Sequence, residues 1–501
     1  MSVDTNNAAF QDALNLIQYT RQSVFLTGKA GTGKSTFLRY VCENTKKKHV
    51  VLAPTGIAAI NAGGSTMHSF FKLPFYPLLP DDPNLSLQRG RIHEFFKYTK
   101  PHRKLLEQIE LVIIDEISMV RADIIDAIDR ILRVYSHNLR EPFGGKQLLL
   151  VGDVFQLEPV VKNDEREILN RFYPTPYFFS ARVFGQIDLV SIELQKVYRQ
   201  TDPVFVGVLD HIRNNTAGAA DLQLLNTRYG SQIEESEADM YITLATRRDT
   251  VDSINEKKLA ELPGDPITFE GVIEGDFPES SLPTSQELVL KPGAQIIFIK
   301  NDFDRRWVNG TIGVIAGIDE EEETIYVITD DGKECDVKRE SWRNIRYRYN
   351  EKTKEIEEEV LGSFTQYPIR LAWAITVHKS QGLTFSRVVI DFTGGVFAGG
   401  QAYVALSRCT SLDGIQLKKP INRADVFVRP EIVNFAGRFN DRQAIDKALK
   451  QAQADVQYAA ASRAFDKGDM EECLEQFFRA IHSRYDIAVS YTHLRAHETK
   501  A

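Results

Sequence analysis

The sequence has few cysteines, no long apolar run and no leader-like N-terminus. The four cysteines, Cys42, Cys335, Cys409 and Cys473, lie far apart and form no CxxC pair, which argues against a disulfide framework and suits a reducing compartment. No apolar run approaches the roughly 20 residues that cross a membrane. The opening residues, MSVDTNNAAF, lack the basic and apolar regions of a signal peptide. We therefore expect an intracellular protein that makes no membrane contact.

Positive charge is not in excess either. The chain has 61 Lys and Arg against 69 Asp and Glu, a net charge of −8, whereas proteins that wrap DNA are commonly basic. Acidic residues are concentrated in runs such as 319–323 and 355–359. A local groove can therefore still be positive, and net charge alone does not exclude a nucleic-acid binder.

Apolar runs of strand length alternate with segments of helical pattern in the first part of the chain. The runs are SVFLTG at 23–28, VVLAP at 50–54, LVIIDE at 111–116 and KQLLLVGD at 146–153. This alternation predicts an α/β fold with a parallel sheet covered by helices on both faces. From about residue 190 a second series, VSIEL, YITLAT, RVVIDF and the segment 414–417, predicts a second domain of the same class.

Three segments break this rhythm. Four prolines among aromatic residues at 70–83 predict an inserted subdomain at 70–100, and short strands with Asn-Gly and Asp-Gly turns predict an inserted small antiparallel β-barrel at 291–370. A helical hairpin of tetratricopeptide type turning at Gly468 is expected at 436–488. The expected α/β domains are then 1–69 with 101–189, and 190–290 with 371–435. The tail at 489–501 resembles translated vector sequence, and we expect the natural chain to continue into more repeats.

A glycine-rich loop lies between a predicted strand and a predicted helix. GKAGTGKS at 28–35 matches GxxxxGKS, in which backbone amides wrap phosphates at a helix N-terminus. Lys34 would reach the β and γ oxygens, and the Ser35 hydroxyl would ligate Mg²⁺. The expected nucleotide contacts are Gly28, Ala30, Gly31, Thr32, Gly33, Lys34, Ser35 and Thr36. The sequence therefore predicts a nucleoside triphosphate and Mg²⁺ as cofactors.

Two carboxylates and an amide follow later strands. Asp115 and Glu116 end LVIIDE, which suits Asp115 for the Mg²⁺ shell and Glu116 for orienting and deprotonating the attacking water. Gln156 in GDVFQLEPV is placed to sense the γ-phosphate or to hold that water. Phosphoryl transfer also needs a cation opposite the leaving phosphate. Arg199 in LQKVYRQ and Arg408 in YVALSRCTS are the candidates, although either can instead be a surface or salt-bridge arginine.

The ordered motifs resemble those of the superfamily-one helicases, and within them the Pif-type branch related to RecD. They are GKAGTGKST, APTGIAAINAGGSTMHSF, VIIDEISMV, PFGGKQLLLVGDVFQLEPV, VYRQ, WAITVHKSQGLTF and QAYVALSRCTS. The resemblance implies two RecA-like motor domains with ATP between them, single-stranded DNA across their tops and movement in the 5′-to-3′ direction. The polarity rests on the resemblance alone.

The resemblance also implies residue roles. Gln11 would read adenine, Gly382 would lie beside the γ-phosphate, and Arg199 and Arg408 would reach across the cleft and draw the second domain toward the first. For DNA it implies contacts from Pro54, Thr55, Gly56, Thr66, His68 and Ser69 in the first motor domain and from Thr246, Asn255, His378 and Lys379 in the second. Backbone and hydroxyl contacts predict weak sequence preference and salt-sensitive binding.

The insertion at 70–100 directly follows the expected DNA contacts at 66–69. Its prolines stiffen the loop, and exposed Phe75 and Tyr76 would stack on a terminal base pair, which predicts a strand-separating wedge. The alternative is an insertion that only packs on the motor.

An ATP-dependent DNA helicase is the expected function. The alternatives are a DNA-binding ATPase that acts as a switch or loader without unwinding, and a nuclease, for which we find no carboxylate cluster outside the motor. The expected partners are single-stranded DNA and tailed duplexes, with G-quadruplexes and RNA–DNA hybrids suggested by the family, and a protein partner for the helical C-terminal segment. A bacterial protein of this kind would be cytoplasmic and nucleoid-associated, and a nuclear or mitochondrial location stays open.

Overall fold

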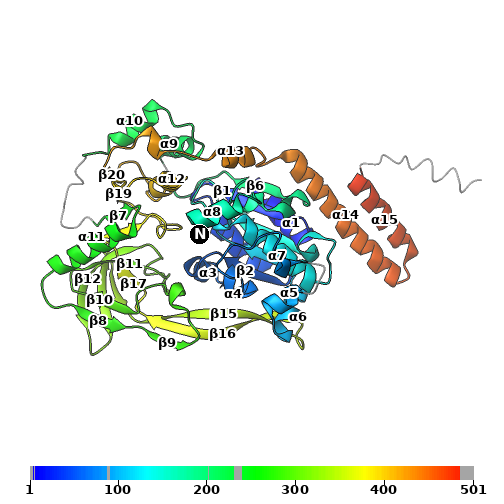
Figure 1. Ribbon diagram of the computed structural model, residues 1–501, viewed down its shortest axis with the longest axis horizontal. Helices are drawn as coiled ribbons and strands as arrows, with labels where there is room; N and C mark the ends of the chain where they lie inside the picture. The colour runs from blue at the N-terminus through cyan, green and yellow to red at the C-terminus, as the bar shows by residue number, and fades with distance from the viewer. Residues whose placement is uncertain (1–3, 5, 87–90, 201, 231–239, 486–501) are drawn as a thin grey trace, which may run out of the picture.

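The first α/β domain is built on a six-stranded parallel sheet. The computed structural model describes residues 4, 6–86, 91–200, 202–230 and 240–485 (Figure 1). The sheet has the strand order β3-β2-β4-β5-β1-β6, and the bounds are β1 Val24–Gly28, β2 His49–Ala53, β3 Ser65–Thr66, β4 Leu111–Ile114, β5 Gln147–Val151 and β6 Val190–Leu194. Strands β1, β4 and β5 are buried along their whole length, as central parallel strands require. The predicted α/β class is confirmed.

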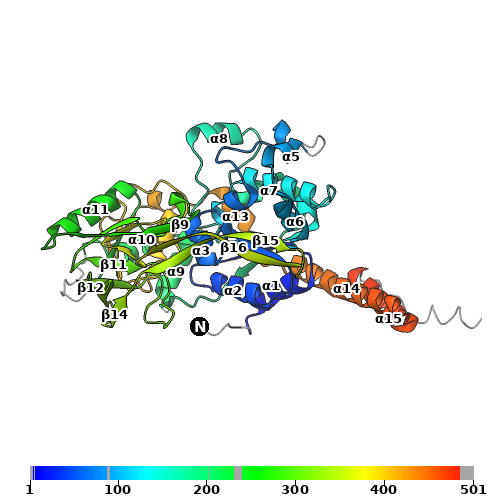
Figure 2. The same cartoon turned by 90° about the horizontal axis from the view of Figure 1, so that it is seen from below.

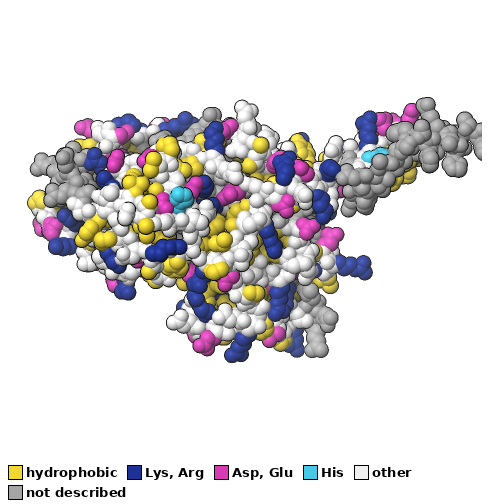
Figure 3. Space-filling view, turned by 90° about the horizontal axis from the view of Figure 1, so that it is seen from above, with side chains coloured by type: hydrophobic (Ala, Val, Ile, Leu, Met, Phe, Trp, Pro, Cys, Tyr) yellow, Lys and Arg dark blue, Asp and Glu magenta, His cyan; other side chains and the backbone are white. Residues whose placement is uncertain are grey.

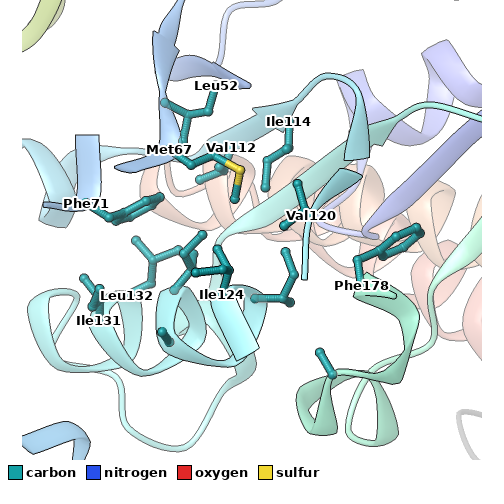
Figure 4. Packing of buried hydrophobic residues seen from close by; sticks show 14 of the residues in the cluster. Leu52, Met67, Phe71, Val112, Ile114, Val120, Ile124, Ile131, Leu132 and Phe178 are labelled. Atoms are coloured by element: carbon teal, nitrogen blue, oxygen red, sulfur yellow. The ribbon is translucent and has the colours of Figure 1, made fainter. Parts of the chain in front are cut away.

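Helices cover both faces of this sheet. One face packs on α1 (Ala8–Tyr19) and α2 (Lys34–Asn44), and the other on α4 (Met67–Phe71), α6 (Lys100–Gln108) and α7 (Ala122–Tyr135). Figure 4 shows the core between the sheet and α7. Met67 and Phe71 of α4 and Val112 and Ile114 of the sheet lie there opposite Ile124 and Leu132 of α7. The remaining helices of this part are α3 Gly56–Ala62, α5 Arg91–Phe96 and α8 Asn163–Leu169.

The second α/β domain has a four-stranded parallel sheet of order β18-β7-β19-β20. Its elements are β7 Ile242–Ala245, β18 Ala374–Thr376, β19 Val388–Asp391, β20 Ile415–Leu417, α9 Pro203–Arg213, α10 Ala219–Asn226, α11 Arg248–Glu261 and α12 Gln401–Leu406. The assignment of VSIEL to this domain is wrong, because β6 pairs with β1 in parallel and completes the first sheet. An apolar strand fits either sheet, because its sequence pattern does not determine which strand it pairs with.

The β-rich insertion begins earlier than residue 291. A five-stranded antiparallel sheet, β14-β13-β12-β11-β17, shares its core with the pair β8–β10, which starts at Ile267. The bounds are β8 Ile267–Glu270, β9 Val272–Gly275, β10 Glu287–Leu290, β11 Gln295–Phe298, β12 Ile312–Asp319, β13 Thr324–Thr329, β14 Glu334–Val337 and β17 Ile369–Leu371.

A long hairpin leaves the insertion and runs along the first domain. It consists of β15 (Glu340–Asn350) and β16 (Glu355–Gln366) and lies beside the first sheet in both ribbon views (Figures 1 and 2). Tyr347 and Tyr349 enter the first domain's core. The hairpin thereby connects the β-rich insertion to the first domain by apolar packing.

The predicted subdomain at 70–100 is anchored to the first domain. Leu78 and Leu85 are buried in its core, and the Arg130 guanidinium donates to the carbonyl of Pro80 at 2.6 Å. By contrast, Phe75 is 84% exposed and Tyr76 is 53% exposed. The insertion therefore both packs on the domain and presents two aromatic rings to solvent.

A helical arm forms the C-terminal part of the described chain. After α13 (Pro430–Ala436), the helices α14 (Arg442–Asp466) and α15 (Met470–Tyr485) pair as a hairpin around Gly468 and project from the body (Figure 1). Ile445 and Ala448 of α14 pack against α1. The tail at 489–501 lies outside the described residues. None of the described helices has the length and apolarity to cross a membrane.

Charged side chains of both signs are interspersed on the face of the body seen from above (Figure 3). Acidic side chains do not form one patch on this face. The electrostatic potential of each cavity therefore depends on the charged residues that line it.

Candidate nucleotide and nucleic-acid site

The glycine-rich loop has the conformation that its sequence predicts. Strand β1 ends at Gly28 and α2 begins at Lys34, with Gly33 as a left-handed N-cap that supplies no side-chain bond to the helix. The first amides of α2 are therefore available to an anion. A side chain at Gly31 would place its Cβ 2.4 Å from the Cβ of Arg199, so only glycine fits between the loop and that residue.

The Lys34 ammonium lies inside this loop. Its Nζ donates to the carbonyls of Gly28 at 2.7 Å and Lys29 at 3.0 Å. Burial lowers the pKa of Lys34, while the charges of Asp153 and Glu116 oppose that shift. An anion bound in the loop would favour the charged ammonium in the same way.

A cavity of about 900 Å³ opens over the loop, between the two α/β domains. Most of the predicted nucleotide and catalytic residues line it: Ala30, Gly31, Thr32, Gly33, Lys34, Ser35, Thr36, Glu116, Gln156, Arg199, Gly382 and Arg408. Among the described residues, Gln11, Gly28 and Asp115 do not belong to this lining. Instead, Asn7 and Phe10 from the start of α1 and Tyr198 reach it. The sequence analysis did not predict these three residues. Gln11 was the only predicted contact near the start of α1.

The two carboxylates lie close together at the end of β4. Glu116 has left-handed backbone angles (φ 50°), and its amide donates to the Asp115 carboxylate at 2.9 Å. Burial, followed by the charge of Asp115, raises the pKa of Glu116 to about 7, and burial also raises the pKa of Asp115. A raised pKa near neutrality suits a general base.

Ser35, Asp115 and Glu116 meet along a second cavity of about 520 Å³. No group of three or more His, Cys, Asp or Glu side chains that could hold a metal ion occurs in the described part of the chain. Mg²⁺ is commonly bound through one or two carboxylates together with substrate phosphates and water. The hydroxyl of Ser35 and the half-buried carboxylate of Asp115 fit that pattern.

Two arginines line the first cavity. Arg199 lies beside the loop, against Gly31, and its guanidinium donates to the carbonyls of Ser407 and Gly382 in the second domain, which also supplies Arg408. Arg408 is 1% exposed, and its guanidinium donates to the carbonyls of Val404, Ser380 and Leu383. Burial, followed by the charge of Arg199, lowers the pKa of Arg408 to about 9. Burial also lowers the pKa of Arg199. The recorded partners of Arg408 are neutral, so an anion in the cavity would be the missing counter-charge.

Several contacts join the domains around the cavity and were not predicted. The Ala30 amide donates to the Tyr403 hydroxyl at 3.1 Å. Arg213 bonds to Asp153 and Glu193 across the domain boundary. Arg213 and Glu193 lie outside the motifs, and the motifs that contain Ala30, Tyr403 and Asp153 do not indicate that these residues make contacts between the domains.

The predicted DNA contacts of the two domains meet along the 520 Å³ cavity. Thr55, His378 and Lys379 line it, and Thr55 also caps α3 by accepting from the Ala58 amide. The cavity further contains Arg370, which was not predicted. Burial lowers the pKa of Arg370 to about 10. Arg370 and Lys379 thus bring positive charge to a cavity that Asp115 and Glu116 also line.

Other predicted contacts have different placements. His68 stacks on Phe75 with ring centroids 4.9 Å apart, beside exposed Ser69. Thr66 caps α4, and Thr246 is buried with a hydroxyl that has no recorded partner. Pro54 and Gly56 flank Thr55 at the start of α3.

Asn255 is used for a structural contact. Its amide donates to the Ala374 carbonyl and accepts from the Ala374 amide, both at 2.9 Å. It therefore holds α11 against β18, and its DNA contact stays a prediction. The motif could not reveal the structural contact, because β18 is more than a hundred residues away along the chain.

Comparisons with known proteins agree with this geometry. The family model "PIF1-like helicase" matches residues 4–211. The chain is 33% identical over 412 residues to the ATP-dependent DNA helicase Pif1 of Campylobacter jejuni, a match that covers 79% of this chain and 88% of that protein. It is 41% identical to the crystal structure of Bacteroides sp Pif1 in complex with ADP-AlF4, with a TM-score of 0.79 and coverage of 87% and 97%.

A structure of Bacteroides Pif1 bound to ssDNA is also 41% identical and covers 89% of this chain and 99% of that chain, with a TM-score of 0.63. At equal identity, the lower TM-score means that the matched parts are arranged differently in space.

Proposed function

The chain belongs to the PIF1-like helicases, and from this membership we propose that it is an ATP-dependent DNA helicase that moves 5′-to-3′ along single-stranded DNA. One observation carries the proposal: a single interdomain cavity is lined by the phosphate loop, Glu116 and Gln156 together with Arg408 of the second domain, and the guanidinium of Arg199 bonds to carbonyls of that domain. A site divided in this way is complete only when the two domains approach each other.

In the proposed reaction, the loop amides and Lys34 bind the phosphates, and Asn7, Phe10 and Tyr198 border the nucleotide. Glu116 takes the proton of the attacking water, and Gln156 orients that water. Ser35 and Asp115 would hold Mg²⁺, which neutralises charge on the phosphates. Arg199 and Arg408 stabilise the charge that develops during transfer.

Movement follows from the position of these arginines in the second domain or at its border. Bound triphosphate attracts them toward the loop, and hydrolysis removes this attraction, so the cleft closes and opens once per cycle. DNA held by Thr55 on one domain and by His378, Lys379 and Arg370 on the other side would then be passed along in steps. Contacts to phosphates predict weak sequence preference.

Single-stranded DNA and tailed duplexes are the proposed substrates. We propose G-quadruplexes and RNA–DNA hybrids as further substrates of the same activity. The α14–α15 arm is the proposed site for a protein partner, because Leu474 and Phe477 leave apolar surface exposed on it.

An unwinding assay tests this function. A duplex with a 5′ single-stranded tail should be unwound with ATP and Mg²⁺, and the same duplex with a 3′ tail should not, because the proposed motor enters on the 5′ side. Lys34→Ala is the matched inactive control. Preference for the 3′ tail would refute the polarity, and DNA-stimulated ATPase without any unwinding would favour the switch or loader.

Strand separation by Phe75 and Tyr76 is a separate prediction. Replacing the whole loop 74–84 would also delete Leu78, which is buried in the core, so the sharper variant is Phe75→Ser with Tyr76→Ser. Base stacking on an aromatic ring contributes about 1–3 kcal/mol per base. We therefore expect unwinding to fall about tenfold, while ATPase stimulated by single-stranded DNA stays within about twofold.

The matched control is Phe465→Ser, an exposed aromatic ring on α14. Equal loss of ATPase and unwinding in the double variant, or loss of neither, would show that these rings do not separate the strands.

A further inference from the structure

The segment 153–158 carries Gln156 and is enclosed by the second α/β domain, although it follows β5 of the first. Leu157 is 0% exposed and belongs to the apolar core of the second domain. A Cβ at Gly400 would lie 2.3 Å from the carbonyl oxygens of both Phe155 and Gln156. The backbone on either side of the Gln156 side chain is therefore in direct contact with the second domain.

Arg213 makes polar contacts between the second domain and the segment 153–158. It ends α9, a helix that packs into the second domain's core through Phe205 and Leu209. Its guanidinium donates to the Asp153 carboxylate at 3.1 Å and forms an ion pair with Glu193 at 2.8 Å, both in the first domain. It also lies 4.3 Å from the centre of the Phe155 ring, and the residue is 3% exposed.

Asp153 connects Arg213 to Gln156 through its carboxylate. The two oxygens of its carboxylate accept from Arg213, and one of them also accepts from the Gln156 side-chain amide at 3.5 Å. The other accepts from the Phe155 amide at 3.2 Å, and the Asp153 carbonyl accepts from the Gln156 backbone amide at 2.9 Å. Displacing Arg213 would free this carboxylate and with it the amide of Gln156.

We infer that Arg213 is a positioning residue for Gln156 and that it transmits the position of the second domain to the γ-phosphate site. Among the described residues that line the nucleotide cavity, Gln156 is present and Arg213 is not, so Arg213 acts through Asp153. Its side chain moves with α9, and Gln156 is aligned only while α9 and β5 keep this spacing. The inference rests on the role proposed above for Gln156.

A purely structural role for the ion pair is the competing explanation. A buried arginine with two carboxylate partners stabilises a fold whether or not it serves catalysis, and its removal leaves buried charges unpaired. Arg213→Met can therefore fail to fold. Arg213→Lys keeps the charge but loses the planar fork and the stacking on Phe155, so it alters geometry with less risk to folding.

The test is a double-mutant cycle on the full chain, with ATP and saturating single-stranded DNA. Arg213→Lys should lower kcat about tenfold or more and leave KM for ATP within about twofold, because a small misplacement of a positioned group costs up to about 10²-fold in rate. Arg213→Lys combined with Gln156→Ala should be no slower than Gln156→Ala alone, since both changes remove the same alignment.

Arg228→Lys is the matched control, because its recorded bonds run to Ile415 and Asp413 within the second domain; it should retain wild-type kcat. Wild-type kcat in Arg213→Lys, or additive effects in the double variant, would overturn the inference and leave the helicase function standing. Wild-type kcat in Gln156→Ala would overturn the role of Gln156 and this inference together.

Discussion

Glu116→Gln is expected to bind ATP with unchanged affinity and to hydrolyse it at least about 100-fold more slowly than the wild type, the loss that is usual for a missing general base. Glutamine keeps the shape and the hydrogen-bonding reach of the side chain but cannot accept a proton. The backbone at Glu116 is left-handed, and both side chains meet the same backbone requirement. The variant therefore isolates the chemistry from the fold.

Lys34→Ala is its counterpart. Lys34 lies in the loop itself, so its removal should weaken ATP binding as well as turnover. Binding of a labelled, non-hydrolysable ATP analogue and steady-state ATPase with single-stranded DNA separate the two variants. ATPase of Glu116→Gln within about tenfold of wild type would assign the proton to another group.

The pH profile gives a second readout on Glu116. A base must be deprotonated to act, and burial with the neighbouring Asp115 raises the pKa of Glu116 to about 7. In the wild type, kcat/KM should therefore fall as the pH drops through about 7 and level off above it, because kcat/KM reports the free enzyme. The residual activity of Glu116→Gln should lack this inflection.

Arg408→Ala is expected to lower DNA-stimulated hydrolysis by about 10³-fold, the lower end of what an arginine opposite the transferred phosphate contributes. Nucleotide and DNA affinity should change little, because Arg408 acts only in the closed state. Even with its pKa lowered to about 9, the guanidinium is charged at neutral pH. Its recorded bonds go to neutral groups, so the charge remains available for a phosphate.

The controls for Arg408 address its burial. Alanine would leave a void where the buried guanidinium donates to Val404 and Ser380, so thermal unfolding must accompany the ATPase assay. Arg408→Lys keeps a positive charge without the planar fork and is expected to recover part of the rate. Normal DNA-stimulated ATPase in Arg408→Ala would remove Arg408 from the catalytic machinery.

Features that depend on neighbours along the chain could be predicted from the sequence. The loop at 28–35 is defined by glycines, by the strand before it and by the helix after it, and the structure has β1 ending at Gly28 and α2 starting at Lys34. Asp115 and Glu116 were identifiable because they end an apolar strand. The α/β class followed from the alternation of such strands with helical segments.

Features that depend on distant neighbours could not be predicted in this way. VSIEL has the apolar pattern of any buried parallel strand, and only the paired backbone shows that it lies beside β1. The sequence shows Asn255 only as a polar residue in a helix. The folded chain brings its side-chain amide to the Ala374 carbonyl. Arg213 and Arg370 have no distinguishing pattern in the sequence. Only the folded chain brings Arg213 onto Asp153 and places Arg370 in the same cavity as Lys379.

The sequence by itself thus determined the fold class, the phosphate loop and the family, because each depends on residue types at short, regular spacings. The tertiary structure decided which strand completes which sheet, which arginines line the cavity over the phosphate loop and which residue bonds to Asp153 beside Gln156. The physical reason is that hydrogen bonds, ion pairs and burial act over a few ångströms in space, and folding brings together groups such as Arg213 and Asp153 that lie 60 residues apart along the chain.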